Sequence, residues 1–262
     1  MAATHESGHA KNVASYEQLI SYCVGYGTTY NPSKNALKVA SMNTQLANAV
    51  TLLTTEKQKH NAYSSAVDAR EILFDPLSKL ITRIMNSLKS SEVTEQIVTD
   101  AKTIARKVTG KRATPKSKKA LDAFIESTHE GAKTTENAAT TAETEEHKEI
   151  SSSQMSYDNR LDNLSKLVNL LSSETGYAPN ETELKVATLN TMLTTMKAKN
   201  TAVINAITAL SNARIERNKI LYKDGTGVYD VAQDVKAYIK SVFGTTSPEY
   251  KQVSKLKFSK PR

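Results

Sequence analysis

The sequence predicts an all-α protein: an elongated helical bundle built from two similar tandem halves, each with one long helix. Three observations lead to this fold class. A motif that begins Tyr-x-Pro occurs at Tyr30 and again at Tyr177, 147 positions later. Each motif is followed by a run without Gly or Pro, from 33 to 74 and from 180 to 222. A continuous helix over either run would be roughly 60 Å long at ~1.5 Å per residue.

The third observation is that apolar side chains recur along each run at alternating spacings of four and three residues. This heptad pattern is typical of helices that pack along one stripe. In the second run the stripe consists of Leu189, Leu193, Met196, Asn200, Val203, Ile207, Leu210, Arg214, Arg217 and Leu221. In the first run it consists of Met42, Leu46, Ala49, Leu53, Glu56, His60, Tyr63, Val67, Arg70 and Phe74. We expect both stripes to pack against helices of the same chain. An intermolecular coiled coil is the alternative, disfavoured because neither stripe is apolar throughout.

The Tyr-x-Pro motif indicates a helix start. The fixed φ of proline suits the first helical position, where its missing N–H costs nothing. Ser33 and Asn180 are alternative N-caps, and Asn180 with Glu183 three residues later fits a capping box. The long helices are therefore expected to begin near these residues and to end near Phe74 and Tyr222.

Shorter helices are expected before and after each long one. In the first half the spacing of apolar residues predicts them at 12–24, 77–88 and 94–108. In the second half the corresponding helices are expected at 160–171, at 228–243 and from Ser247 onward. Ser247 as N-cap with Pro248 at the first helical position is a favourable helix start. Each half thus has a short, a long, a medium and a short helix.

The predicted domains are a first helical repeat at 1–126, a linker at 127–152 and a second helical repeat at 153–262. The linker holds six Glu against two Lys, is rich in Thr and Ala, and lacks a strong periodicity. Such a composition cannot bury enough apolar area to offset the entropy lost on ordering. The linker is therefore expected to contribute little to the core.

Composition limits the class of protein further. A lack of Trp and few Gly and Pro suit helices better than a β-sandwich or a dinucleotide-binding sheet. Cys23 is the single cysteine, so no intrachain disulfide can form, and its apolar neighbours predict a buried side chain. We find neither an apolar signal-peptide region nor the ~18 apolar residues of a membrane span. The expected location is the cytoplasm or an assembled particle.

No catalytic, cofactor-binding or metal-binding pattern is recognisable, so we expect a non-enzyme without a cofactor. The acidic residues around His147 are expected to form a solvated charge run rather than a metal site. The formal net charge is +8, and basic residues gather at 101–119 and near the C-terminus. The candidate contacts for an anion or a partner are Arg70, Arg217, Lys111, Arg112, Lys255 and Lys257.

Arg70 and Arg217 occupy matching positions of the two stripes. We expect each arginine to extend its charged head to solvent or to pair with an acid such as Asp68 or Glu216. A paired anion site at a pseudo-twofold axis is the alternative.

Five stretches stand out together: His9–Val13, Tyr26–Leu37, Ala69–Ile72, Gly110–Ala113 and Ser156–Leu161. In combination they resemble a family of uncharacterised tandem-repeat helical proteins common in Bacteroidota. The resemblance spans nearly the whole chain, apart from a linker richer in Thr, Ala and Glu. It implies a bacterial source. Because no activity is established for that family, the resemblance assigns no site residues.

The expected function is structural: a non-enzymatic scaffold or assembly subunit whose helical faces contact protein, including self-association. The alternative is a basic protein that binds nucleic acid or an anionic surface non-specifically, and this is less favoured because no nucleic-acid module is recognisable. A pore-forming helical toxin would need an apolar membrane hairpin, which the sequence lacks.

Overall fold

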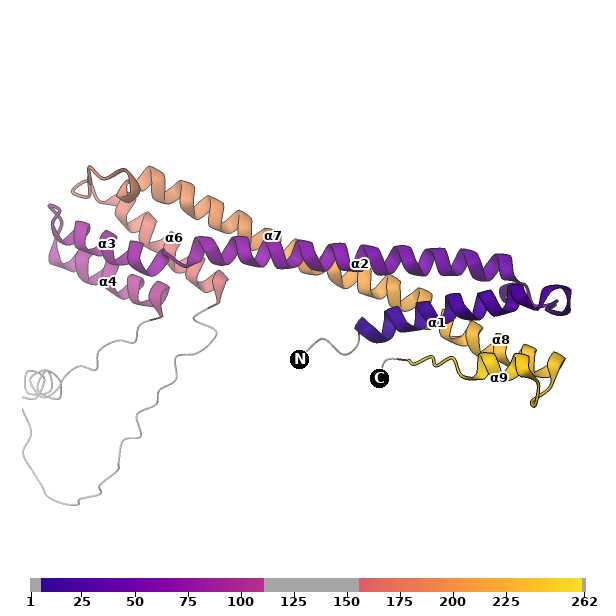
Figure 1. The fold of residues 1–262 in the computed structure, drawn as a ribbon. Helices are drawn as coiled ribbons and strands as arrows, with labels where there is room; N and C mark the ends of the chain where they lie inside the picture. Colours follow the sequence, from indigo (N-terminus) through magenta and orange to yellow (C-terminus); the bar gives the residue numbers. More distant parts are fainter. Residues whose placement is uncertain (1–5, 111–155, 261–262) are drawn as a thin grey trace, which may run out of the picture. The chain divides into compact units, whose positions relative to one another are not determined.

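The computed structural model describes residues 6–110 and 156–260, and every regular element within them is helical, with no strand (Figure 1). The α-helices are α1 (Glu6–Gly25), α2 (Val39–Phe74), α3 (Leu77–Lys89), α4 (Glu95–Thr109), α6 (Tyr157–Ser173), α7 (Val186–Tyr222), α8 (Val228–Phe243) and α9 (Pro248–Ser254). Short 3-10 turns are η1 (Gly27–Thr29), η2 (Asn35–Leu37) and η4 (Thr182–Leu184). The predicted all-α class is confirmed for this part of the chain.

The chain forms two compact units, and unit 1 is built from two separate segments of the chain. Unit 1 consists of residues 1–68 and 202–262, and unit 2 consists of residues 69–201. Because α2 and α7 each cross a unit boundary, each unit combines segments from both predicted repeats. The predicted linker 127–152, and with it both predicted domain boundaries, lies outside the described residues.

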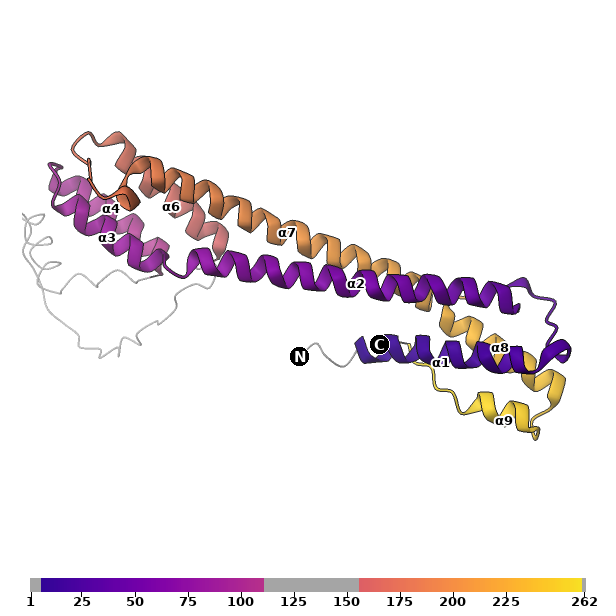
Figure 2. The same cartoon turned by 45° about the horizontal axis from the view of Figure 1, so that its top comes forward.

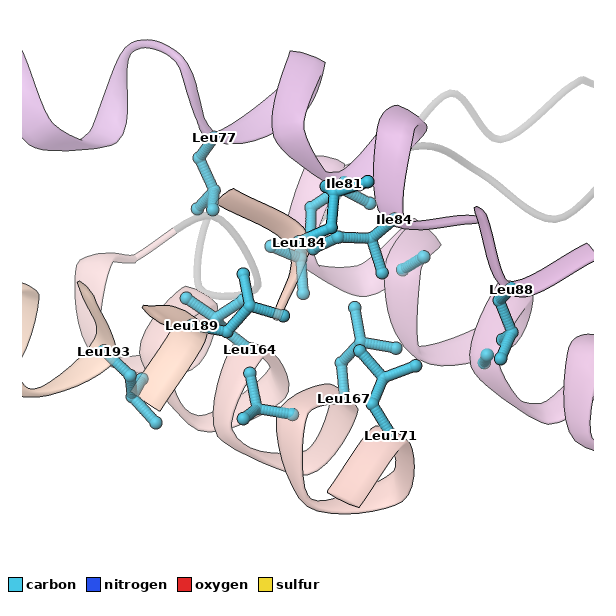
Figure 3. Close-up of a cluster of buried hydrophobic side chains, with 14 of the residues drawn as sticks. Leu77, Ile81, Ile84, Leu88, Leu164, Leu167, Leu171, Leu184, Leu189 and Leu193 are labelled. Carbon is cyan, nitrogen blue, oxygen red and sulfur yellow. The ribbon is translucent and has the colours of Figure 1, made fainter. Parts of the chain in front are cut away.

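The core of unit 2 is a leucine- and isoleucine-rich cluster. Buried side chains of α3, α6 and α7 point toward one another in Figure 3, and α4 packs against both α3 and α6. The buried members from these elements include Leu77, Ile81, Ile84, Leu88, Leu164, Leu167, Leu171, Leu189 and Leu193. On each helix these residues recur at spacings of three and four, so one face of each helix is buried, as the apolar periodicity predicts.

The core of unit 1 gathers side chains from both ends of the chain. Helix α8 packs against α1 and α9, and Figure 2 shows these three helices close together. The buried members include Tyr16, Leu19, Cys23, Met42, Leu221, Val235, Ile239 and Val253, with Leu46 partly buried against them. The stripe residues Leu46 and Leu193 are thus both in contact with cores of their own chain, in units 1 and 2 respectively.

The Tyr-x-Pro motif does not begin a helix, and the predicted capping box at Asn180 is wrong. Helix α7 begins at Val186, after the turn η4, and α2 begins at Val39, after η2. The motif instead anchors the loop. The Tyr30 hydroxyl donates to the carbonyl oxygen of Leu37 at 2.7 Å, and the Tyr177 hydroxyl donates to that of Leu184 at 2.9 Å. After each Tyr-x-Pro motif, the tyrosine hydroxyl therefore donates to the carbonyl oxygen of the residue seven positions later.

Other predicted helix ends agree with the structure. The Thr94 hydroxyl caps α4 by accepting from the Ile97 N–H, and the Ser247 hydroxyl caps α9 by accepting from the Tyr250 N–H. Pro248 stands in the first turn of α9, as expected. These caps satisfy donors that the start of a helix leaves without intrahelical partners.

Candidate functional site

Helix α7 exposes an apolar stripe within unit 1. The side chains of Ile204, Ile207 and Ile215 are 52%, 40% and 59% exposed. Thr208 and Ser211 lie on the same side of the helix, because 204, 208, 211 and 215 follow the spacing four, three, four. The Thr208 hydroxyl donates to the Ile204 carbonyl oxygen at 2.9 Å, so the hydroxyl is satisfied locally. We call these five residues the isoleucine face.

The first repeat shows that the fold does not require isoleucine at these positions. Residues 147 positions earlier, on α2, are Lys57, His60 and Asp68, and all three are exposed. The same helical positions are therefore occupied by charged or polar residues in one repeat and by isoleucine in the other. The isoleucine face thus combines three exposed isoleucines with two small hydroxyl residues.

A buried ionic cluster joins α2 and α7 within unit 1. The Glu56 side chain is only 3% exposed, and its Oε1 accepts from Arg214 Nε at 3.1 Å. Its Oε2 lies 3.5 Å from Arg217 Nη1, and the Arg217 side chain is 7% exposed. Arg217 also donates through Nε and Nη2 to the Asn218 side-chain oxygen. This cluster fixes which turn of α7 lies beside Glu56, because any other register would bury an unpaired charge.

Arg70, the counterpart of Arg217, lies in a different environment in unit 2. Its Nη1 donates to Asn200 Oδ1 at 3.1 Å, and its guanidinium carbon lies 3.7 Å from the ring centroid of Tyr157. Asn200 in turn donates to Asp158 at 2.6 Å. Arg70 Nε is buried without a hydrogen-bond partner.

The surroundings of Arg217 can be compared with the two expectations for it, an acidic partner or a bound anion. Arg217 is paired with Glu56 on another helix rather than with its neighbour Glu216, which instead pairs with Lys219. The Glu56 carboxylate compensates the charge of Arg217, which disfavours capture of a free anion there.

Of the other four residues predicted to contact an anion or a partner, the structure describes two. Lys255 and Lys257 are exposed on the segment that follows α9, whereas Lys111 and Arg112 lie outside the described residues. Lys257 lines a cavity of about 430 Å³ that sequence reasoning did not identify. Its lining residues are Lys11, Asn12, Gln233, Lys236, Leu256, Lys257, Phe258 and Ser259. We call this cavity the lysine pocket.

The described residues offer little for covalent or metal chemistry. Cys23 is 1% exposed, and burial raises the pKa of its thiol to about 11, so the thiol is protonated at neutral pH. No group of three or more His, Cys, Asp or Glu that could hold a metal ion occurs among the described residues. Within the same residues, no helix combines the length and apolarity needed to cross a membrane.

Comparison with known proteins adds no relative: no family model, no curated protein and no solved structure matches this chain.

Proposed function

We propose that this protein is a non-enzymatic helical scaffold that makes protein contacts and associates with a second copy of itself through the isoleucine face of α7. The observation that carries the proposal is the contrast between the repeats. Ile204, Ile207 and Ile215 are exposed where the first repeat has Lys57, His60 and Asp68. Exposed apolar side chains that gather on one side of a helix are a feature of interaction surfaces.

A second copy is the occupant that the pattern of the face favours. The outer positions of the four-three-four spacing are both isoleucine, Ile204 and Ile215, and the inner positions are Thr208 and Ser211. At these four positions the order of isoleucine and small hydroxyl residue is the same in either chain direction, and Ile207 lies beside them. An antiparallel α7 from a second copy would place Ile204 against Ile215 of its partner, with the small residues at the centre. Such a contact is isologous, as in most homodimers.

The expected strength follows from the exposed area. Complete burial of an isoleucine side chain contributes about 1.5–3 kcal/mol, so covering the exposed half contributes roughly 1 kcal/mol. A symmetric contact covers six such side chains, for roughly 6 kcal/mol in all. The loss of translational and rotational freedom opposes association by about 4–15 kcal/mol. The isoleucine side chains offset this loss only at the lower end of that range, so a dimer at millimolar concentration needs further contacts beside the isoleucine face.

Sedimentation velocity over a wide range of protein concentration tests this proposal. We expect the wild type to shift toward a dimer as concentration rises. The variant Ile204→Lys/Ile207→His/Ile215→Asp, which introduces the residues of the first repeat, should stay monomeric with unchanged helicity. Ile72→Lys is the control, because Ile72 is a 72% exposed isoleucine of unit 2 outside the isoleucine face. A wild type that remains monomeric at millimolar concentration, or a triple variant that associates like the wild type, would contradict the proposal.

The proposal includes the finer prediction of an elongated bundle of two tandem halves. Its support is the pair of matching bonds, from Tyr30 to Leu37 and from Tyr177 to Leu184. Small-angle scattering of the monomeric triple variant would test the elongated shape. Membership of the Bacteroidota tandem-repeat family, and a location in the cytoplasm or in an assembled particle, belong to the same proposal.

A second candidate function is non-specific binding of nucleic acid or another anionic partner. The formal charge of +8 and the lysine pocket favour it. Binding of this kind weakens steeply as salt rises, whereas apolar self-association does not. Measuring both at low and high salt would separate the two functions.

A further inference from the structure

The lysine pocket combines three cationic side chains from three separate parts of unit 1. Lys11 comes from α1, Lys236 from α8 and Lys257 from the segment after α9. No Asp or Glu is among the residues that line the cavity. The side-chain amide of Gln233 adds a polar group to the same lining. A cavity with this lining presents hydrogen-bond donors and positive charge to whatever enters it.

The C-terminal wall of the pocket is held in place by a buried asparagine. Asn12 is 2% exposed, its Nδ2 donates to the Ser259 carbonyl oxygen at 2.7 Å, and its Oδ1 accepts from the Ser259 N–H at 3.0 Å. The same Nδ2 donates to the Tyr222 hydroxyl at 3.1 Å. This pair of bonds fixes the backbone beside Lys257 and Phe258. The pocket is therefore a built feature rather than a chance approach of the tail.

Lys236 lines the lysine pocket and is partly buried. Its ammonium donates to the Leu256 carbonyl oxygen at 2.5 Å and lies 5.0 Å from the ring centroid of Phe258. Burial lowers the pKa of this lysine, because desolvation disfavours its charged form. An ammonium has three N–H donors, so the bond to Leu256 leaves others for a ligand.

The carboxylates nearest in sequence on α8 are already engaged by other cations. Asp234 pairs with Lys34 at 2.6 Å. Asp230 pairs with Lys260 at 3.3 Å and accepts from the Gly225 N–H at 2.7 Å. Both carboxylates therefore already have cationic partners, and neither is among the residues that line the lysine pocket.

We propose that the lysine pocket binds the phosphate group of an organic phosphate. A tetrahedral phosphate offers several strong acceptor oxygens, which suits ammonium donors from three parts of the chain better than a flat carboxylate would. The cavity of about 430 Å³ is large enough for the phosphate together with a small organic group. A free nucleotide and a nucleic-acid strand present the same group, and the experiment separates these sources. The inference does not depend on self-association, because none of the pocket residues belongs to the isoleucine face.

Backbone amide NMR titrations with inorganic phosphate, adenosine monophosphate and a short oligothymidine test the proposal. We expect saturable shifts at residues 11–12 and 257–259, with inorganic phosphate binding in the millimolar range. Lys11→Gln/Lys257→Gln should weaken binding by roughly tenfold or more. The control Lys240→Gln/Lys251→Gln removes the same charge outside the pocket and should leave the dissociation constant within about twofold. Tighter binding of adenosine monophosphate would identify a small phosphate ester, and tighter binding of oligothymidine would identify a strand.

Three results would overturn the inference, and the third concerns Lys236. One is the absence of saturable shifts with all three probes at about 10 mM. Another is an equal loss of binding in the pocket variant and in the control variant, which would assign the attraction to overall charge. Lys236→Met gives a further check: loss of phosphate binding with an unchanged helical circular-dichroism spectrum supports the pocket, and unchanged binding contradicts it.

Discussion

Replacing Glu56 with alanine tests the buried ionic cluster of unit 1 most sharply. The change would leave Arg217, whose side chain is only 7% exposed, without its carboxylate partner. Removing one partner of a buried ion pair costs about 3–5 kcal/mol, because the remaining charge stays buried. Arg214 is 44% exposed and can turn to water, so it adds little to this cost. We therefore expect Glu56→Ala to lower the free energy of unfolding by about 3 kcal/mol.

Urea denaturation followed by circular dichroism measures this loss. With a slope of about 2–3 kcal/mol per molar urea, the midpoint should fall by roughly 1 M. Glu216→Ala is the matched control, since Glu216 is 57% exposed and pairs with Lys219 only at 3.8 Å. That control should change stability by about 0.5 kcal/mol or less.

A double-variant cycle shows whether the cost arises from the unpaired arginine. Glu56→Leu combined with Arg217→Met replaces the pair by apolar side chains, which is often neutral or stabilising. The double variant should therefore regain most of the stability that Glu56→Ala loses. The reasoning is refuted if Glu56→Ala costs less than about 1 kcal/mol, or if the two changes are additive without coupling.

Three further predictions concern packing, the repeated loop and the thiol. Leu193→Asp places an unpaired charge in the core of unit 2 and should lower the free energy of unfolding by about 4 kcal/mol or more. The exposed change Lys199→Asp should be nearly silent in thermal unfolding. Equal effects of the two changes would contradict the burial of Leu193. Tyr30→Phe and Tyr177→Phe each leave a buried carbonyl without its donor. Each change should lower the free energy of unfolding in urea by about 1–2 kcal/mol. A large difference between the two losses would argue against equivalent loops. The pKa of Cys23 is raised from 9.0 to about 11, so between these values the unfolded chain loses its thiol proton first and stability should fall as pH rises through that window. Iodoacetamide should accordingly label Cys23 at pH 8 only after unfolding, and rapid labelling of the folded chain would contradict its burial.

Local sequence signals predict the shorter helices well. The helix expected at 77–88 is α3, and that expected at 228–243 is α8, because each has apolar residues at helical spacing between clear breaks. The predicted Ser247 cap is likewise determined by neighbouring residues. The helix start at Tyr-x-Pro was predicted wrongly because the hydroxyl of Tyr30 has a partner seven residues away. A capping rule that looks three residues ahead cannot include that bond.

The candidate sites depend on contacts that a single sequence does not contain. Pairing Glu56 with Arg217 requires the register between α2 and α7. The lysine pocket requires that Lys11 and Lys257, near opposite ends of the sequence, line one cavity. Ile207 was assigned to the buried stripe by its spacing, yet it is 40% exposed between the buried residues Val203 and Leu210. Periodicity identifies the side of a helix, and only the folded chain shows where another element covers it.

Site-directed disulfide trapping on the isoleucine face tests the proposed self-association most directly. Chains carrying Ile204→Cys are mixed with chains carrying Ile215→Cys and oxidised gently, with the buried Cys23 left in place. An antiparallel contact brings position 204 of one copy beside position 215 of the other, whereas equal positions lie roughly 16 Å apart along the helix. We predict cross-linked dimers in the mixture and few in either variant alone, since a disulfide requires Cα atoms within about 7 Å. Efficient cross-linking of each variant with itself, or none in the mixture at concentrations where the wild type associates, would contradict an antiparallel dimer through α7.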